Sequence, residues 1–494
     1  TIMSQISELD KYSVFKYFEE ISKIPRKSGD MDRISNFLVD FAKDNDLDFI
    51  QERCKNVLIR KKATTGYEHI EPVLLQGHID MVCEKNADSI HDFDNDPIKL
   101  IAKDDYIYAD NTTLGADNGI AVAYMMALLT AKDVKHPAIE ALFTVDEETT
   151  MLGAFETAEQ NLRAKYMINL DMECDDELLL SSAGGCDTLL SLPVEYTPVG
   201  GKFLTANIKV HGLKGGHSGG DINKNRGNSI QIMGRVLYEL NKRVEFEIES
   251  INGGSKVNAI PRECECVIVF DKAEKSAIED IIKFVEREIK DELKEVDEDF
   301  KLQLCHNNEK IEKVFNYATR QKLINALMIY TSGVMQMSLE IQDLVDTSNN
   351  LGIITTDEKN RKITFHCGVR SCIDSQVLYI AKKHEALANI LNADIDIFSV
   401  YPGWRYKETK FSKLVAETFE KMYSKPMKKK AAHAGVECGI FCKKMPYLDI
   451  VSIGPTMYEV HTPNEHVSIS SAIRTYEFLV KILENMIDLN KQIL

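Results

Sequence analysis

Apolar runs of strand length alternate with amphipathic helical stretches through the first third of the chain. Apolar residues recur at helical spacing from 10 to 48, with a break at 24–29. A further helix is expected over 119–131, with Asp117 and Asn118 as N-cap candidates. Between and after these helices, apolar runs predict strands at 56–61, 72–78, 139–145 and 165–171. This alternation predicts an α/β domain with a mostly parallel central sheet.

From about residue 187 the pattern changes to period-two strands, each followed by a long amphipathic helix. Two segments have the same order of turn, strand, connector and helix: "SKVNAIPRECECVIVFDKAEKSAIEDIIKFVEREIKDEL" and "SNNLGIITTDEKNRKITFHCGVRSCIDSQVLYIAKKHEALANIL". A repeated supersecondary unit indicates an internal duplication. We therefore expect an inserted α+β domain over 187–400, made of two related halves.

After this insertion the α/β pattern returns. A helix is expected at 410–423, an apolar strand at 447–455, and a final amphipathic helix from Ser470. The 494 residues are also too many for one hydrophobic core. We therefore expect a catalytic domain in two segments, 1–186 and 401–494, with the insertion acting as a lid.

Charge and cysteine content narrow the possible partners and the compartment. The net charge is −17, whereas nucleic acids and anionic membranes need a basic face, so neither is an expected partner. No apolar run is long enough to cross a bilayer, and the first twenty residues lack the features of a signal peptide. The 11 scattered cysteines suit a reducing cytoplasm, and Cys264 and Cys266 fit a strand with buried thiols better than a metal site.

Polar residues follow the apolar strands at the edge where ligands gather in open α/β sheets. Together with two loop residues they are His78, Asp80, Asp117, Asp146, Glu147, Glu148, Asp171 and His461. Taken singly, each acid is explained as a turn residue and each histidine as a satisfied polar group. Together, they form a net-negative cluster that needs a cation. Imidazole and carboxylate ligands without clustered cysteine suit Zn²⁺, Mn²⁺ or Co²⁺.

Seven motifs occur in the order "LLQGHIDMV", "GADNGIAVAYMMALL", "FTVDEETTMLGA", "INLDME", "GGHSGGDI", "VNAIP" and "VHTPNEHVSI". They resemble, over nearly the whole chain, those of the aminoacylase/carnosinase superfamily of co-catalytic zinc metallopeptidases. Within it, "GHIDMVCEKN", "AHAGVECGI" and the two-part lid are similar to the bacterial aminoacyl-histidine dipeptidases. The resemblance implies a zinc-peptidase-like catalytic domain, a small peptide substrate and a homodimer formed through the lid.

The resemblance also implies roles for the strand-end residues. The implied ligand set is His78 and Asp171 on one ion, Glu148 and His461 on the other, and Asp117 bridging both. Glu147 is the implied general base. Two cations that share a water lower the pKa of that water. Asp80, counted with the catalytic residues, can fix the tautomer of His78. Asp146 is expected to hydrogen-bond, because three consecutive side chains cannot all face one metal pair.

Lid residues supply the remaining candidates. His217 in "KGGHSGGDI" is a candidate donor to the tetrahedral oxyanion, in its own subunit or across a dimer, and the alternative is a surface loop histidine. In relatives, positions such as Asn258 and Arg370 serve the transition-state oxygen and the substrate carboxylate. An arginine fork suits a carboxylate, although a surface salt bridge also explains Arg370. His433 and Glu437 in "AHAGVECG" are further substrate-binding candidates.

Three functions fit these residues. The first is a metallo-dipeptidase, acting on Xaa-His peptides including β-alanyl-histidine. The second is the same dinuclear hydrolase acting on N-acyl amino acids or other short peptides. The third is a non-catalytic metal- or peptide-binding protein, which is disfavoured because a metal site needs Glu148 but not a free Glu147 beside it. A Gly-x-Ser-x-Gly elbow and a phosphate-binding loop are both absent from the sequence.

Overall fold

The computed structural model describes residues 6–490, and the chain divides into two compact units. The prediction that the N-terminal residues form no signal peptide falls partly on residues 1–5, which lie outside the described residues. Unit 1 comprises Thr1–Ser181, Tyr406–Ala431 and Val436–Leu494, and unit 2 comprises Ser182–Arg405 and Ala432–Gly435. Between residues 6 and 490 no helix combines the length and apolar character needed to span a membrane.

An eight-stranded sheet in the order β1-β2-β6-β3-β7-β23-β8-β22 forms the centre of unit 1. Its strands are β1 (Asp48–Gln51), β2 (Val57–Lys61), β3 (Val73–His78), β6 (Ile139–Thr144), β7 (Tyr166–Asn169), β8 (Glu177–Ser182), β22 (Lys428–Ala432) and β23 (Asp449–Ser452). Strands β6, β3, β7 and β23 are parallel, and β1, β2 and β8 pair antiparallel. The expected α/β fold is confirmed, with parallel pairing in the four central strands.

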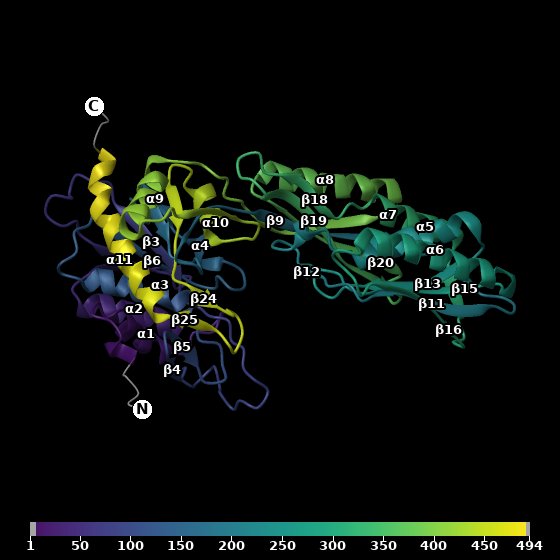
Figure 1. Ribbon diagram of the computed structural model, residues 1–494, viewed down its shortest axis with the longest axis horizontal. Helices are drawn as coiled ribbons and strands as arrows, with labels where there is room; N and C mark the ends of the chain where they lie inside the picture. Colours follow the sequence, from purple (N-terminus) through teal and green to yellow (C-terminus); the bar gives the residue numbers. More distant parts are fainter. Residues whose placement is uncertain (1–5, 491–494) are drawn as a thin grey trace. The chain divides into compact units, whose positions relative to one another are not determined.

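Every residue of β3 and β6 is buried, which explains why these runs are apolar without alternation. The helices of unit 1 are α1 (Val14–Ser22), α2 (Asp32–Asp44), α3 (Ala116–Thr130), α4 (Leu152–Glu156), α9 (Lys410–Tyr423), α10 (Glu437–Lys444) and α11 (Ile469–Asn485). Helix α3 contacts α1, α11 and β3 (Figure 1), and its side chains are buried on all sides. A second sheet, β24-β25-β5-β4, contains β4 (Leu100–Lys103), β5 (Tyr106–Ala109), β24 (Met457–Tyr458) and β25 (His466–Ser468).

The start of α3 differs from the sequence prediction. Gly115 occupies the N-cap position in a left-handed conformation, and the side chains of Asp117 and Asn118 do not cap the helix. Asn118 Oδ1 accepts from the backbone N–H of His78 at 3.1 Å, and its Nδ2 donates to Leu170 O at 2.8 Å. The predicted side-chain cap is therefore wrong, because the Asn118 side chain joins the ends of β3 and β7 instead, but Asp117 and Asn118 have non-helical backbone angles, so the regular helix begins near Gly119 as predicted.

Unit 2 is built on a nine-stranded antiparallel sheet in the order β16-β11-β15-β13-β19-β20-β9-β21, with β18 paired to β19. These strands are β9 (Gly184–Pro193), β11 (Leu204–His211), β13 (Glu247–Gly253), β15 (Cys264–Phe270), β16 (Lys301–Asn307), β18 (Gly333–Met337), β19 (Val345–Asp357), β20 (Lys362–Ser371) and β21 (Asp394–Tyr401). Two small ladders pair β10 (Tyr196–Pro198) with β17 (Lys313–Phe315) and β12 (Gly216–His217) with β14 (Ala259–Ile260).

The sheet order of unit 2 confirms two related halves. One half has the order β16-β11-β15-β13, and the other has the mirrored order β21-β9-β20-β19. In each half a long helix links an inner strand to the edge strand, as β15–α6–β16 and as β20–α8–β21. The helices are α5 (Ser229–Arg243), α6 (Lys275–Leu293), α7 (Tyr317–Ile329) and α8 (Asp374–Leu391). Burial alternates residue by residue along β20, as expected when helices cover one face (Figure 1).

His384 is a buried histidine in unit 2, on the face of α8 that packs against β9. Its Nδ1 lies 2.8 Å from Thr188 Oγ1, and its ring meets the Tyr330 ring edge-on at 5.0 Å. Only 5% of the residue is exposed. Burial disfavours the charged imidazole and lowers the pKa of His384 to about 4.

We expect His384 to make unit 2 less stable in acid. The unfolded chain takes up this proton near pH ~6.5, and the folded chain only near 4. Between these pH values the unfolded state binds more protons, so stability falls as pH falls, by at most about 3 kcal/mol. Thermal melts of the parent and His384→Gln from pH 7 to 4.5 should show a smaller acid loss in the variant. His306→Gln, at an exposed histidine, is the control, and equal acid loss in all three proteins would contradict the prediction.

Candidate metal centre

The ends of the parallel strands of unit 1 bring the first group of candidate ligands together. His78 is the last residue of β3, and Asp171 follows β7. His78 Nε2 lies 3.2 Å from Asp117 Oδ1 and 3.5 Å from Asp171 Oδ1. Glu147, which follows β6, has Oε2 at 3.7 Å from the same nitrogen. The neighbouring order of β6, β3 and β7 therefore places His78, Glu147 and Asp171 around one point, and the start of α3 adds Asp117.

A second group shares Asp117 with the first. His461 lies in the connection between β24 and β25, and its Nε2 is 3.0 Å from Asp117 Oδ2 and 3.0 Å from Glu148 Oε1. Asp117 thus presents one carboxylate oxygen to each histidine. This is the geometry that a ligand shared by two cations requires.

The donor set fits divalent metal ions. Three groups have ligand atoms within 4.8 Å of one another: His78–Asp117–Asp171, Asp117–Glu148–His461 and His78–Glu147–Glu148. All donors are imidazole nitrogens or carboxylate oxygens, as Zn²⁺, Mn²⁺ and Co²⁺ accept. Over residues 6–490 the same criterion finds one more group, Cys174, Asp176 and Glu177. Its acids already pair with Lys428 and Lys430 at 3.0 and 3.2 Å.

Mutual hydrogen bonding shifts the pKa values of these ligands. Hydrogen bonds with Asp117 and Glu148 raise the pKa of His461 to about 11. Burial opposes ionisation of Asp117, but hydrogen bonds with His461 and His78 outweigh burial and lower its pKa. Burial also raises the pKa of Asp171, to about 7. Ionised carboxylates this close together repel one another, so a bound cation would stabilise the cluster relative to the same carboxylates without one.

Glu147 has the environment of a proton acceptor. Burial raises the pKa of Glu147 well above its ordinary value, and the nearby His78 only partly offsets this. Negative charges on Asp171, Glu437 and Glu148 add to the increase. A carboxylate with a raised pKa takes a proton more readily near neutral pH.

Asp80 holds several parts of the cluster in place. Its Oδ1 lies 3.2 Å from His78 Nδ1 and accepts from the backbone N–H of Glu147 at 3.0 Å. Its Oδ2 accepts from the backbone N–H of Glu148 at 3.2 Å and from the Ser28 hydroxyl at 2.7 Å. Asp80 therefore orients the His78 ring, with Nε2 toward Asp117, and also fixes the backbone of the two glutamates.

Two further acids lie beside the cluster. Asp146 Oδ1 accepts from the backbone N–H of Gly29 at 2.6 Å, in agreement with the expected hydrogen-bonding role. Glu437, the first residue of α10, is fully buried and accepts from Gln76 and Thr144 through Oε2. Its Oε1 is buried and has no hydrogen-bond partner among residues 6–490, and burial raises the pKa of Glu437 to about 7. The substrate contact predicted for Glu437 stays a prediction.

The other predicted substrate residues lie in unit 2. Arg370 on β20 carries a positive charge that lowers the pKa values of both His217 and His433, although burial is the larger cause in each case. For His433 the pKa falls to about 4, and its Nε2 lies 2.6 Å from Ser348 Oγ. Asn258 is exposed, and its carbonyl accepts from Ser218, next to His217. Unit 2 thus gathers one guanidinium and two neutral histidines, a set suited to an anion.

His217 has a defined tautomer in its neutral form. Its Nδ1 accepts from the backbone N–H groups of Gly219 and Gly220, both at 3.1 Å. A neutral imidazole with an accepting Nδ1 carries its proton on Nε2. His217 therefore offers an N–H donor through its outer nitrogen, as the oxyanion role predicted for it requires.

Comparison with known proteins agrees with this geometry. The model of "Peptidase family M20/M25/M40" matches residues 74–485. The chain belongs to this peptidase family. The family membership confirms the expected peptide-bond hydrolase and the resemblance found in the sequence.

Three relatives illustrate the likeness of this peptidase to known proteins. The "Cytosol non-specific dipeptidase" of Escherichia coli (strain K12) is 34% identical over 486 residues, covering 98% of this chain and 99% of that protein. The crystal structure of an aminoacylhistidine dipeptidase from Vibrio alginolyticus has a TM-score of 0.92 at 34% identity, covering 97% and 98% of the two chains. A tripeptidase from Staphylococcus aureus, at a TM-score of 0.54 and 16% identity over 98% and 100% of the two chains, shares the fold alone.

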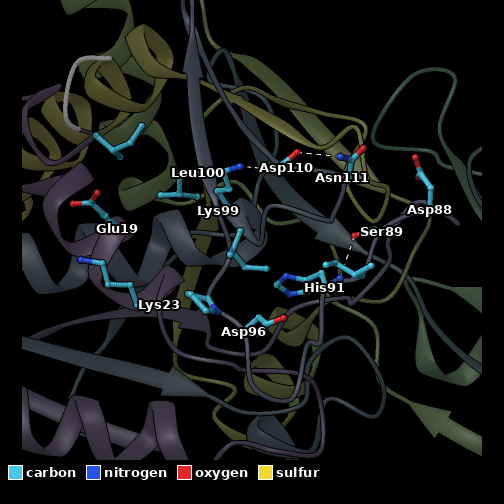
Figure 2. A pocket seen from close by; sticks show the side chains of 14 residues that line it. Glu19, Lys23, Asp88, Ser89, His91, Asp96, Lys99, Leu100, Asp110 and Asn111 are labelled. Atoms are coloured by element: carbon cyan, nitrogen blue, oxygen red, sulfur yellow. Dashed lines mark hydrogen bonds and ion pairs between the residues drawn. The ribbon is translucent and has the colours of Figure 1, made fainter. Parts of the chain in front are cut away.

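A cavity of about 670 Å³ in unit 1 of the peptidase is lined by none of the predicted site residues (Figure 2). Glu19, Asp88, Asp96 and Asp110 line it together with Lys23 and Lys99, and Lys99 pairs with Asp110 at 2.7 Å. Its charges are of both signs and partly neutralise one another.

Sequence reasoning missed two buried charged residues of the peptidase. Arg26 lies in the helix break at 24–29 and donates to backbone carbonyls next to His78 and Asp117. Glu465 lies four residues after His461 and accepts from backbone N–H groups next to Asp117. Charged residues in "IPRKSG" and "HTPNE" are the available signals, but neither motif distinguishes a buried charge from a solvated one.

We expect substitutions in the centre to remove metal ions in defined numbers. Asp117→Asn should lose both ions, because both groups use the Asp117 carboxylate, whereas Glu148→Gln should lose one. Equilibrium dialysis with Co²⁺ and metal analysis give the count per chain. Asp146→Asn, one residue before Glu147 and outside all three groups, is the matched control and should bind as the parent does. Two tightly bound ions in Asp117→Asn would contradict the shared-ligand assignment.

Proposed function

We propose that this peptidase is a dinuclear metal-dependent dipeptidase that hydrolyses the single peptide bond of Xaa-His and other dipeptides. The observation that carries the proposal is the division of Asp117 between two histidines, with Glu147 beside them. His78 faces Asp117 Oδ1 and His461 faces Asp117 Oδ2. A site that only stored metal would need this shared ligand but no free, high-pKa carboxylate next to it.

Zn²⁺ is the ion we propose, with Mn²⁺ or Co²⁺ as substitutes. The proposed ligands are His78 and Asp171 on one ion, Glu148 and His461 on the other, and Asp117 on both. Two cations held by these residues would supply Lewis-acid polarisation of the scissile carbonyl and would make a bound water more acidic. A ligand set of imidazole and carboxylate groups without a thiolate is typical of catalytic zinc sites.

The remaining steps belong to side chains of the chain itself. Glu147 is the proposed general base: it accepts a proton from the attacking water and passes it to the leaving amine. Asp80 holds the backbone of Glu147 in position by accepting a hydrogen bond from the Glu147 N–H at 3.0 Å. His217, with its proton on Nε2, is the proposed donor to the oxygen that becomes negative in the transition state.

The proposed substrate class rests on the relatives and on the cationic group of unit 2. Proteins named cytosol non-specific dipeptidase and aminoacylhistidine dipeptidase are each 34% identical to nearly all of this chain. Arg370, with His433 and the exposed Asn258 in the same unit, is the proposed anchor for the free C-terminal carboxylate. We propose a cytoplasmic enzyme, which the absence of disulfides among its 11 cysteines supports.

A substrate panel tests this proposal. Metal-depleted protein should be inactive, and added Zn²⁺, Mn²⁺ or Co²⁺ should restore cleavage of β-alanyl-histidine and other dipeptides. Tripeptides and N-acyl amino acids complete the panel, with amino acid release measured by chromatography. Cleavage of N-acyl amino acids without dipeptide cleavage would overturn the proposal in favour of an amidohydrolase, and no cleavage by the two-metal protein would indicate a binding protein.

Glu147→Gln separates catalysis from metal binding. We expect kcat to fall at least ~100-fold, because the amide cannot take the proton, while both ions stay bound. Stopped dipeptide assays and metal analysis on the same preparation measure the two properties. Asp146→Asn is again the matched control, and a Glu147→Gln enzyme with parental kcat would rule out the proposed base.

We also propose a homodimer formed through unit 2, and the duplicated halves provide an internal comparison that supports it. Edge strand β16 exposes polar groups such as Lys301 and Gln303, whereas edge strand β21 exposes Ile397, Phe398 and Val400. Helix α8, which precedes β21, likewise exposes apolar side chains, namely Leu378, Tyr379 and Ile390. Long apolar edges are rare on monomers because they invite strand pairing. The apolar edge at β21 is therefore the proposed dimer face.

Charge placed on β21 should weaken this dimer. We expect Phe398→Lys with Val400→Glu to shift the protein toward monomer at micromolar concentration, because an unpaired charge would be buried in the interface. Analytical ultracentrifugation measures the shift. The same charges on the opposite edge, Gln303→Lys with Cys305→Glu, are the matched control. A parent that is monomeric at all concentrations, or a dimer insensitive to the β21 substitutions, would contradict this interface.

A further inference from the structure

Arg26 is a buried arginine whose guanidinium donates to three backbone carbonyls. Its exposed fraction is 2%, and it lies between α1 and α2. Nη1 donates to the carbonyls of Ile79 and Asp80 at 3.1 and 3.3 Å, and Nη2 donates to the carbonyl of Gly115 at 2.5 Å. The first two carbonyls directly follow His78, and the third precedes Asp117. Arg26 therefore joins the chain segments that carry these two ligands.

Glu465 makes the complementary connection from the other side. The residue is 2% exposed and lies four positions after His461. Its Oε2 accepts from the backbone N–H groups of Leu114 and Gly115 at 2.7 and 3.0 Å. Its Oε1 accepts from the backbone N–H of Asp117 itself at 3.2 Å. Glu465 therefore joins the Asp117 segment to the connection that carries His461.

The segment 114–117 is thus held between two opposite charges. The cation of Arg26 takes its carbonyl side, and the anion of Glu465 takes its N–H side, so each charge meets the matching end of the peptide dipoles. Glycines leave room for the guanidinium: a Cβ on Gly115 or Gly119 would lie 2.5 or 2.7 Å from Arg26 Nη2. Gly115 also has φ +72°, which favours glycine.

The electrostatics couple the two residues to each other. Burial lowers the pKa of Arg26, and Glu465 is the strongest of the negative charges that oppose this effect, ahead of Asp80. Burial raises the pKa of Glu465 to about 7. Buried charges contribute little net stability compared with apolar residues of the same size, so the backbone contacts of Arg26 and Glu465 point to a role in geometry.

We propose that Arg26 and Glu465 are positioning residues for the proposed metal ligands, because they hold the segment 114–117, which carries Asp117, between the His78 strand and the His461 connection. The inference rests on the metal centre proposed above. Neither residue belongs to the proposed ligand set, because both carry out their role through backbone groups. The effect of each residue should therefore appear in metal affinity and coordination geometry before it appears in chemistry.

Glu465→Gln tests the anionic half. The amide keeps the size of the side chain but leaves only one accepting oxygen for three N–H groups. We expect the affinity for the second Co²⁺ ion to fall about 10–100-fold, as is typical when a partner outside the ligand set is lost. The visible absorption of bound Co²⁺, which reports coordination geometry, should change in shape as well. Isothermal titration calorimetry and absorption spectra measure the two effects.

Arg26→Lys tests the cationic half, since lysine keeps the charge but lacks the fork that reaches both segments. We expect a similar 10–100-fold loss, with changes in the Co²⁺ spectrum. Glu459→Gln, at an exposed glutamate two residues before His461, and Arg33→Lys, at an exposed arginine of α2, are the matched controls. Both controls should bind two ions with the parental affinity and spectrum.

Thermal melts of the metal-free proteins separate positioning from simple stabilisation. Lower melting temperatures for Glu465→Gln and Arg26→Lys together with parental Co²⁺ affinities and spectra would overturn the proposal, because the residues would then support only the fold. If the parent and Glu465→Gln both bind two Co²⁺ ions equally well, the positioning role is contradicted but the proposed metal centre is not. A parent that cannot bind two ions contradicts the proposed metal centre itself, and the positioning role with it.

Discussion

The sharing of the Asp117 carboxylate between two imidazoles is the interaction around which unit 1 is arranged. His78 reaches one oxygen from the end of a buried parallel strand, and His461 reaches the other from the connection between two short antiparallel strands. The strand order β6-β3-β7 then brings Glu147, Glu148 and Asp171 to the same edge. Each acid would destabilise the others in an apolar setting, so the fold gathers a negative charge that bound cations would balance.

The support for this arrangement is layered. Asp80 fixes the His78 ring and the backbone of the two glutamates through three contacts, and Ser28 donates to its second oxygen. Arg26 and Glu465 hold the backbone on either side of Asp117. In both layers, buried charges bind backbone groups, which have fewer degrees of freedom than side chains. The positions of the ligands are thereby determined mainly by the path of the main chain.

The sequence predicts the parts of this peptidase whose signal is local. An apolar run that ends in "GHID" or "VDEE" identifies a buried strand and the polar residues at its end, and the helices at 410–423 and in α11 follow from periodicity. His461 also follows an apolar strand, and motif resemblance then pairs it with Glu148 and Asp117, which are far from it in the sequence. Arg26 and Glu465 escape prediction because they bind backbone groups distant in sequence, and a backbone group has no sequence signature. The N-cap prediction at Asp117 fails for a related reason: a nearby strand end and two histidines compete for these side chains more strongly than the helix does.

The order of the ligands along the chain has a consequence for biosynthesis. Four of the five proposed ligands, from His78 to Asp171, precede unit 2 in the sequence, and His461 follows it. A ribosome therefore completes all of unit 2 before it adds the last imidazole and the carboxylate of Glu465. Until that moment the nascent chain carries every proposed ligand except His461. Translation thus couples completion of the two-ion centre to near-completion of the polypeptide, so a truncated chain that ends within unit 2 lacks the means to assemble the centre.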